Sequence, residues 1–248
     1  MRRAGSATAL VATIALAGIG VAGCGTAEPS SCATTGTAPT VLSADDRREP
    51  QIASDGGGGI VAVWESVTGG PIEASTRDVT GAWTPARALS DRFARDPTIA
   101  VDPAGSAVAA WQLPTSEATT TVQVAFHDRE RGWSPAADVS PLGAHAREPQ
   151  VAVTGDGTVV LAWRRDAPGS TQTVLEVVER PAGGQWDRPR TLSDPSARAT
   201  RPRLALSPTG SAALVWEQKT NGRNTVMAAT RTPDGSWVAA PPVPGTFV

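Results

Sequence analysis

Residues 95–140 read RDPTIAVDPAGSAVAAWQLPTSEATTTVQVAFHDRERGWSPAADVS, and this stretch decides the fold. Pro97 to Val101 is a short, mostly apolar segment behind a proline, as at the start of a strand. An Asp-Pro-Ala-Gly turn follows, and then Ala107 to Trp111, which is apolar throughout, as in a strand covered on both faces. Val122 to His127 alternates, and after an Arg-Gly turn the last segment runs from Trp133 to Ser140. The stretch therefore predicts four short strands.

The same unit occurs four times along the chain. All eight Trp fall into two series, and successive members of a series lie 47 to 53 residues apart. A Pro lies 14 residues before each Trp of the first series, and a Gly lies 6 residues before it. The first series is Trp64, Trp111, Trp163 and Trp216, and the second is Trp83, Trp133, Trp186 and Trp237. A period near fifty residues is typical of β-propellers and related arrays.

We therefore predict an all-β domain over residues 37–248, a β-propeller of four four-stranded blades. The repeats lie at about 48–91, 95–141, 147–194 and 200–245. Two arrangements are open at this point: a closed small ring, or an open arc that dimerises. A blade alone would expose apolar faces, so we expect both Trp series to form the repeated core rather than to stack on a ligand.

An additional fragment precedes the first repeat. Thr37 to Ser43 (TAPTVLS) matches the fourth-strand segments at Thr84–Ser90 and Ser134–Ser140. The end of the fourth repeat is rich in proline, which lacks the donor that a strand ladder needs. We therefore expect the N-terminal fragment to complete or cap the fourth blade.

Residues 1–24 form a targeting segment. Arg2 and Arg3 precede an uncharged stretch, Ala7 to Gly20, which is too short to favour a spanning helix. Val21 to Cys24 (VAGC) resembles the bacterial lipobox, which implies a diacylglyceryl group on Cys24 and cleavage just before it; an ordinary cleaved signal is the alternative. Residues 25–36 predict a flexible tether. These features predict export and anchoring to the outer face of the bacterial cell membrane.

Composition excludes several classes of function. Without the targeting segment the chain has 20 Lys and Arg against 24 Asp and Glu, a net charge of −4, whereas a nucleic-acid partner favours a basic patch. The two His and two Cys form no metal-ligand motif, and no nucleophile elbow is present. We predict no cofactor and assign no catalytic residues.

The openings and hairpins of the repeats resemble those of the sialidase-type, Asp-box propeller. The openings are Arg48-Glu49-Pro50, Arg95-Asp96-Pro97, Arg147-Glu148-Pro149 and Thr200-Arg201-Pro202. The hairpins, of which the first is Ser75-x-x-Asp78-x-x-Gly81-x-Trp83, contain Gly and Trp but carry no complete Asp box. The resemblance covers Pro50 to Trp237 and implies a propeller fold. Sialidases use a Tyr nucleophile, and this chain has no Tyr.

The blade-opening arginines are the candidate ligand-binding residues. Repetition should bring them around one mouth of the central channel, where converging guanidiniums bind carboxylate or phosphate groups. The residues of this candidate anion-binding rim are Arg48, Arg95, Arg147 and Arg201. The alternative is that each Arg pairs with the acidic residue beside it, or with a carboxylate of a neighbouring blade, and ties the blades together.

The best prediction of function is a non-enzymatic recognition module at the cell surface, with an acidic glycan or a surface protein as partner. A divergent sialidase-like glycoside-processing enzyme and a structural envelope protein are the alternatives. The oligomeric state does not follow from the sequence.

The lipobox makes a direct prediction about location. Cys24→Ala removes the lipid acceptor, so the variant should move from the membrane fraction to the soluble fraction and escape lipoprotein processing. Fractionation with metabolic labelling of the lipid measures both. Unchanged membrane association of the variant would refute the lipid anchor.

Overall fold

The computed structural model describes residues 39–43, 46–116, 119–167, 169–207 and 209–239. The predicted targeting segment 1–24 with Cys24, the predicted tether 25–36 and the start of the 37–43 fragment lie outside these residues. Within the described part all regular structure is β-strand, and no helix there is long and apolar enough to cross a membrane.

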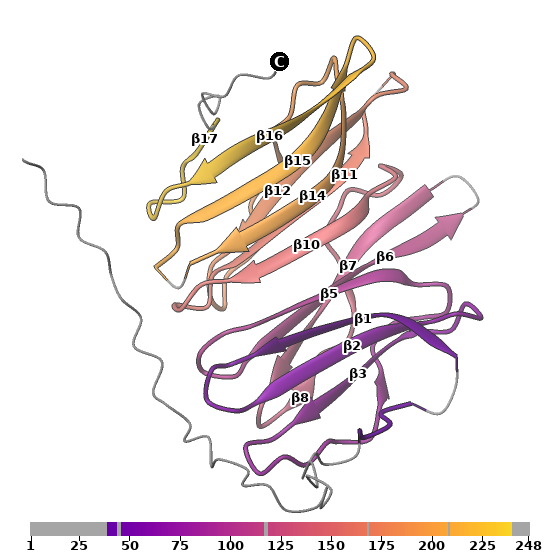
Figure 1. The fold of residues 1–248 in the computed structure, drawn as a ribbon, viewed down its shortest axis with the longest axis vertical. Coiled ribbons are helices and arrows are strands. Elements are labelled where there is room, and N and C mark those ends of the chain that lie inside the picture. Colours follow the sequence, from indigo (N-terminus) through magenta and orange to yellow (C-terminus); the bar gives the residue numbers. More distant parts are fainter. Residues whose placement is uncertain (1–38, 44–45, 117–118, 168, 208, 240–248) are drawn as a thin grey trace, which may run out of the picture. The chain divides into compact units, whose positions relative to one another are not determined.

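The strands form four antiparallel sheets, one for each repeat, in which neighbours follow chain order (Figure 1). The first sheet contains β1 (Arg47–Ser54), β2 (Ile60–Ser66), β3 (Ile72–Arg77) and β4 (Arg87–Ala88). The second contains β5 (Arg95–Val101), β6 (Ala107–Ser116), β7 (Thr119–Asp128), and the short β8 (Gly132–Trp133) and β9 (Ala137–Asp138), which both pair with β7.

The third sheet contains β10 (Arg147–Val153), β11 (Val159–Asp166), β12 (Thr173–Arg180) and β13 (Arg190–Thr191). The fourth contains β14 (Arg198–Leu206), β15 (Ala212–Thr220), β16 (Arg223–Arg231) and β17 (Trp237–Ala239). The predicted fold class, all-β with four four-stranded units, is confirmed. We call β1, β5, β10 and β14 the inner strands, because they open the repeats and contact one another in chain order.

Turn chemistry sets the strand ends. Between β5 and β6, Gly105 has a φ of 85°, which glycine adopts without steric strain. Its N–H donates to the carbonyl of Asp102 at 2.9 Å, and the Asp102 N–H donates to the carbonyl of Ser106 at 2.8 Å. This tight closure explains why the repeated Gly lies at a fixed distance before the Trp of the next strand.

The first Trp series joins consecutive sheets. Trp111 is fully buried against Val63 and Ile72 of the first sheet. Trp163 is equally buried against the second sheet, and Trp216, 4% exposed, packs on the third. Burying about 200 Å² of indole stabilises each junction by up to about 5 kcal/mol. In the second, third and fourth repeats, one Trp is thus part of the apolar contact with the preceding sheet.

The remaining Trp are less uniform. Trp64 is 4% exposed within β2, and Trp133 is 8% exposed. Trp83, Trp186 and Trp237 are half-buried near the hairpins. The second series therefore packs at the ends of the sheets, where solvent reaches part of each ring.

The contacts between inner strands run from β1 to β5, β5 to β10 and β10 to β14, whereas any contact between β1 and β14 is marginal in the described residues. Apolar side chains are correspondingly exposed on the fourth sheet, with Val226 at 78% and Val238 at 50%, and on β1, with Ile52 at 66%. At the position equivalent to Val226 in the third sheet, Leu175 is completely buried. The outward side of the last sheet thus keeps core-like residues without a covering sheet among those described.

The expected completion of the fourth blade by residues 37–43 is not observed. The fourth sheet takes its outer strand from its own repeat, because β17 pairs with β16 through Trp237, Val238 and Ala239. Residues 39–43 form no strand. The prolines of this repeat, Pro241, Pro242 and Pro244, come after β17 in the sequence and do not interrupt it.

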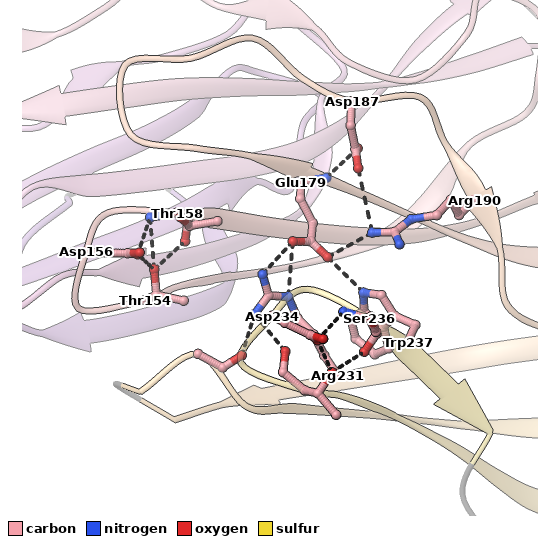
Figure 2. A network of polar contacts seen from close by, with 12 residues as sticks. Thr154, Asp156, Thr158, Glu179, Asp187, Arg190, Arg231, Asp234, Ser236 and Trp237 are labelled. Carbon is pink, nitrogen blue, oxygen red and sulfur yellow. Dashed lines mark hydrogen bonds and ion pairs between the residues drawn. The ribbon is translucent and has the colours of Figure 1, made fainter.

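A polar network joins the third and fourth sheets near their hairpins (Figure 2). Glu179 of β12 accepts hydrogen bonds from Arg231 Nε at 3.0 Å and Nη2 at 2.6 Å, and from the Trp237 indole at 2.9 Å. Arg190 also donates to it at 3.0 Å. Burial alone would raise the pKa of Glu179, but the hydrogen bonds and charges of these partners lower it below its ordinary value.

Arg231→Gln tests this junction. The side chains of Arg231 and Glu179 are only 7% and 11% exposed, so the variant should lose about 3 kcal/mol of unfolding free energy at neutral pH, at the lower end for a broken buried pair. Because the folded pKa of Glu179 is lowered, its stabilisation is complete above the unfolded pKa, about 4.3, and is lost as the pH falls through the folded value.

Urea denaturation of both proteins between neutral and acidic pH measures the effect. The difference between them should shrink in acid, and the exposed Arg188→Gln should behave as the wild type. A difference that stayed constant into strong acid would contradict the role of Glu179.

Candidate functional site

Each inner strand carries a bulge at its opening. The pairing of β1 with β2 shifts register between Arg48 and Gln51, and the other three inner strands shift at the equivalent place. The residue before the proline has a positive φ in every case: Glu49 (49°), Asp96 (52°), Glu148 (53°) and Arg201 (55°). A residue before proline is normally extended, and such a conformation in a non-glycine residue costs of the order of 1–3 kcal/mol. The strain is therefore built into the repeat.

The four strained residues line one cavity of about 530 Å³, which we call the inner-strand cavity. Its polar wall includes Glu49, Gln51, Asp96, Glu148, Gln150 and Arg201. The bulge acts in the same way in all four repeats. It places the residue between Arg (or Thr200) and Pro in the wall of the inner-strand cavity.

Backbone N–H groups at the bulges are taken by side chains of the preceding repeat. The Asp96 N–H donates to Glu65 Oε2 at 2.6 Å, and the Glu148 N–H donates to Gln112 Oε1 at 3.3 Å. Glu65 and Gln112 each follow a Trp of the first series directly. The Arg201 N–H donates to Glu148 Oε2 at 2.8 Å. These bonds hold the inner strands beside one another and keep the strained residues in place.

Ion pairs surround the cavity. Arg48 Nε lies 2.5 Å from Glu65 Oε1, and Glu65 is 1% exposed. Arg164 Nε lies 2.8 Å from Glu148 Oε1. Charge pairing of this kind compensates the burial of Glu65 and restricts the rotamer of Glu148.

The candidate anion-binding rim is dispersed in the structure. Arg48 pairs with Glu65, and Arg147 Nη2 lies 2.6 Å from His145 Nδ1. Arg95 is exposed, and it is not among the residues that line the inner-strand cavity. Arg201 alone of the four lines the cavity, and its guanidinium also contacts both Glu217 oxygens at 2.9 Å.

Sequence reasoning missed that acidic residues, and not the four arginines, make up most of the charged lining of the cavity. Glu49, Asp96 and Glu148 directly follow the predicted arginines, and their repetition was visible as a pattern. The sequence suggests for them only a role as ion-pair partners of the arginines. The signal that separates the two readings is the bulge, which places the second residue of each opening in the cavity.

The acidic cluster perturbs Asp96. Burial raises the pKa of Asp96, and the negative charges of Glu65, Glu148 and Glu49 raise it further, while Arg95 opposes them. Solvent reaches more than a third of this residue and screens part of the repulsion. In the described part of the chain no group of His, Cys, Asp and Glu has an arrangement suited to a metal ion.

Asp96→Asn should stabilise the fold. Asn tolerates a positive φ well, and the substitution removes a like charge from the cluster. Because the folded pKa of Asp96 is raised, its ionisation destabilises the wild type fully above that value, and the effect fades as the pH falls toward the unfolded pKa near 4. Urea midpoints should therefore be higher for the variant at neutral pH and converge in acid. An unchanged or lower midpoint at neutral pH would contradict the repulsion.

No protein-family model and no curated protein matches the sequence. A Hadza microbial sialidase is similar in structure, with a TM-score of 0.53 and 17% identity over 79% of this chain and 46% of that chain. An α-L-arabinofuranosidase from Fusarium graminearum has a TM-score of 0.53 and 14% identity over 81% and 68% of the two chains. An endo-arabinase from Bacteroides thetaiotaomicron has a TM-score of 0.51 and 12% identity over 83% of each.

This chain spans about half the length of the sialidase. At these identities the likeness concerns the fold alone. The chain therefore has a β-propeller fold of the kind seen in these glycosidases, built here from four four-stranded antiparallel sheets.

Proposed function

We propose that the chain is a glycan-binding module and that the inner-strand cavity is its site. One observation carries the proposal: four bulged strand openings direct carboxylates, amides and a guanidinium into one space of about 530 Å³. This volume lies in the range of small-molecule sites. The structural neighbours named above are a sialidase and arabinan-processing enzymes, which makes a saccharide the natural ligand class to test.

The chemistry of the wall favours hydroxyl-rich ligands. Carboxylates accept hydrogen bonds from sugar hydroxyls, and the amides of Gln51 and Gln150 both donate and accept. Three carboxylates face two guanidiniums, those of Arg201 and Arg203. A neutral saccharide therefore fits this cavity better than the acidic glycan that four converging arginines would have bound.

The proposal includes location. Anchoring through Cys24, with residues 25–36 as tether, holds the domain at the outer face of the membrane, where extracellular saccharides are accessible. This part rests on the lipobox resemblance.

A second candidate function, glycoside hydrolysis, has one specific observation in its favour. The pKa of Asp96 is raised within a group of other carboxylates, and a carboxyl group that keeps its proton beside ionised neighbours is suited to act as a general acid. In this alternative Asp96 donates the proton and Glu49 or Glu148 remains ionised.

A binding experiment with the full chain tests the first proposal. We expect affinity for a neutral oligosaccharide on a glycan array, confirmed by calorimetry. The double variant Glu49→Ala/Gln51→Ala removes two exposed groups from the cavity and should weaken binding about thirtyfold, since each of the two lost hydrogen bonds is worth about 1 kcal/mol. Glu130→Ala, on an exposed hairpin, is the matched control.

Equal affinities of the wild type and the double variant would overturn the site, and absence of any saccharide binding would overturn the function. Incubation with chromogenic glycosides separates the second candidate: hydrolysis that Asp96→Asn abolishes indicates an enzyme, and binding without hydrolysis indicates a recognition module.

A further inference from the structure

The junctions between consecutive sheets can be compared position by position. At the third junction, Arg231 lies six residues before its Trp and Glu179 lies seven residues before the Trp of the preceding repeat. Arg231 holds the Glu179 carboxylate through two nitrogens, and the Trp237 indole donates to the same carboxylate (Figure 2). The protein itself therefore shows what this arrangement of side chains binds.

The second junction has the same cation but no carboxylate. Arg180 occupies the position of Arg231, and Phe126 occupies the position of Glu179. The Arg180 guanidinium lies 4.4 Å from the centre of the Phe126 ring, and Trp186 lies 6.5 Å from that ring. In the described part of the chain Arg180 has no carboxylate partner. Its charge is thus balanced only by an aromatic face.

A cavity of about 590 Å³ lies at this junction. Arg180, Phe126 and Trp133 contribute to its wall, together with the apolar Val108, Val153 and Val159. His127 also lines it, and the buried Nδ1 of this residue has no hydrogen-bond partner in the described part. The cavity shares no lining residue with the inner-strand cavity.

We propose that this second cavity binds a carboxylate carried on a ring, with the carboxylate on Arg180 in the place that Glu179 takes on Arg231. A guanidinium and a carboxylate form paired hydrogen bonds of defined geometry. The apolar and aromatic wall accommodates the ring. The site is independent of the proposed saccharide site.

Two carboxylates of the same wall limit the site to one anionic group. Asp102 and Asp128 both line the cavity, but each accepts backbone N–H groups of its own turn, from Ser106 in the first case and from Glu130 and Arg131 in the second. Burial lowers the pKa of His127, so this ring adds a neutral donor or acceptor and no further positive charge. A second guanidinium, that of the exposed Arg131, also lines the wall, but it lies in the same hairpin as Asp128, whose charge opposes it, so Arg180 is the cation left for the ligand.

Calorimetry on the full chain at low salt tests the proposal with two pairs of probes, glucuronate against glucose and benzoate against benzyl alcohol. At least one acid should bind, and its neutral counterpart should bind about tenfold more weakly or not at all. Added salt should lower the affinity for the acid. The two pairs decide whether the ring is a sugar or an aromatic group. Binding of neither acid, or equal binding of an acid and its neutral counterpart, overturns the proposal.

Variants assign the site. Arg180→Gln should lose at least about tenfold in affinity for the acid, whereas the exposed Arg188→Gln in the same repeat should bind as the wild type. Phe126→Glu supplies the carboxylate internally, as Glu179 does at the next junction. This variant should therefore remain folded and also lose its affinity for the acid. Undiminished binding by Arg180→Gln, or by a folded Phe126→Glu, places the ligand elsewhere; if Phe126→Glu does not fold, Arg180→Gln decides alone.

Discussion

The repeated sheet of this protein is apolar on both faces, so each sheet depends on a neighbour for stability. A Trp of the first series takes part in each of the three junctions, and Trp111 and Trp163 have no exposed area at all. This dependence is nearest-neighbour in character, because each core cluster combines residues of two consecutive sheets. Everything else, including both cavities, lies in space that the stacking of sheets creates between or beside these clusters.

Packing at the three junctions differs more than the repeat suggests. The third junction is joined by the Glu179 network, whereas at the second junction the equivalent position holds Phe126 and a cavity lies beside it. The apolar core and the polar ends of a junction are therefore separable. The Trp and aliphatic residues maintain the fold. The residues just before each hairpin form an ion pair at the third junction and line a cavity at the second.

Most of the fold was predictable because its signals are local and repeated. Glycine turns and apolar runs gave the strands, and the spacing of Trp gave the number of sheets. The inner-strand cavity was not predictable in the same way, because the sequence repeats the residues of each bulge but does not show the shift in strand register that places one of them in the cavity. The partner of Arg48 is Glu65, 17 residues away, and not the adjacent Glu49. The short β17 was also missed, since a strand of three residues before a proline-rich end carries little pattern.

The bulge before each proline has a consequence for symmetry. Four equivalent openings would by themselves present a ligand with four equivalent orientations. The residues actually placed there are two Glu, one Asp and one Arg, and their backbone is held by strand pairing, by the following proline and, at Asp96, Glu148 and Arg201, by a hydrogen bond to a side chain of the preceding repeat. The bulge is thus the same in all four repeats while the side chains differ, so the walls of the inner-strand cavity are not chemically equivalent.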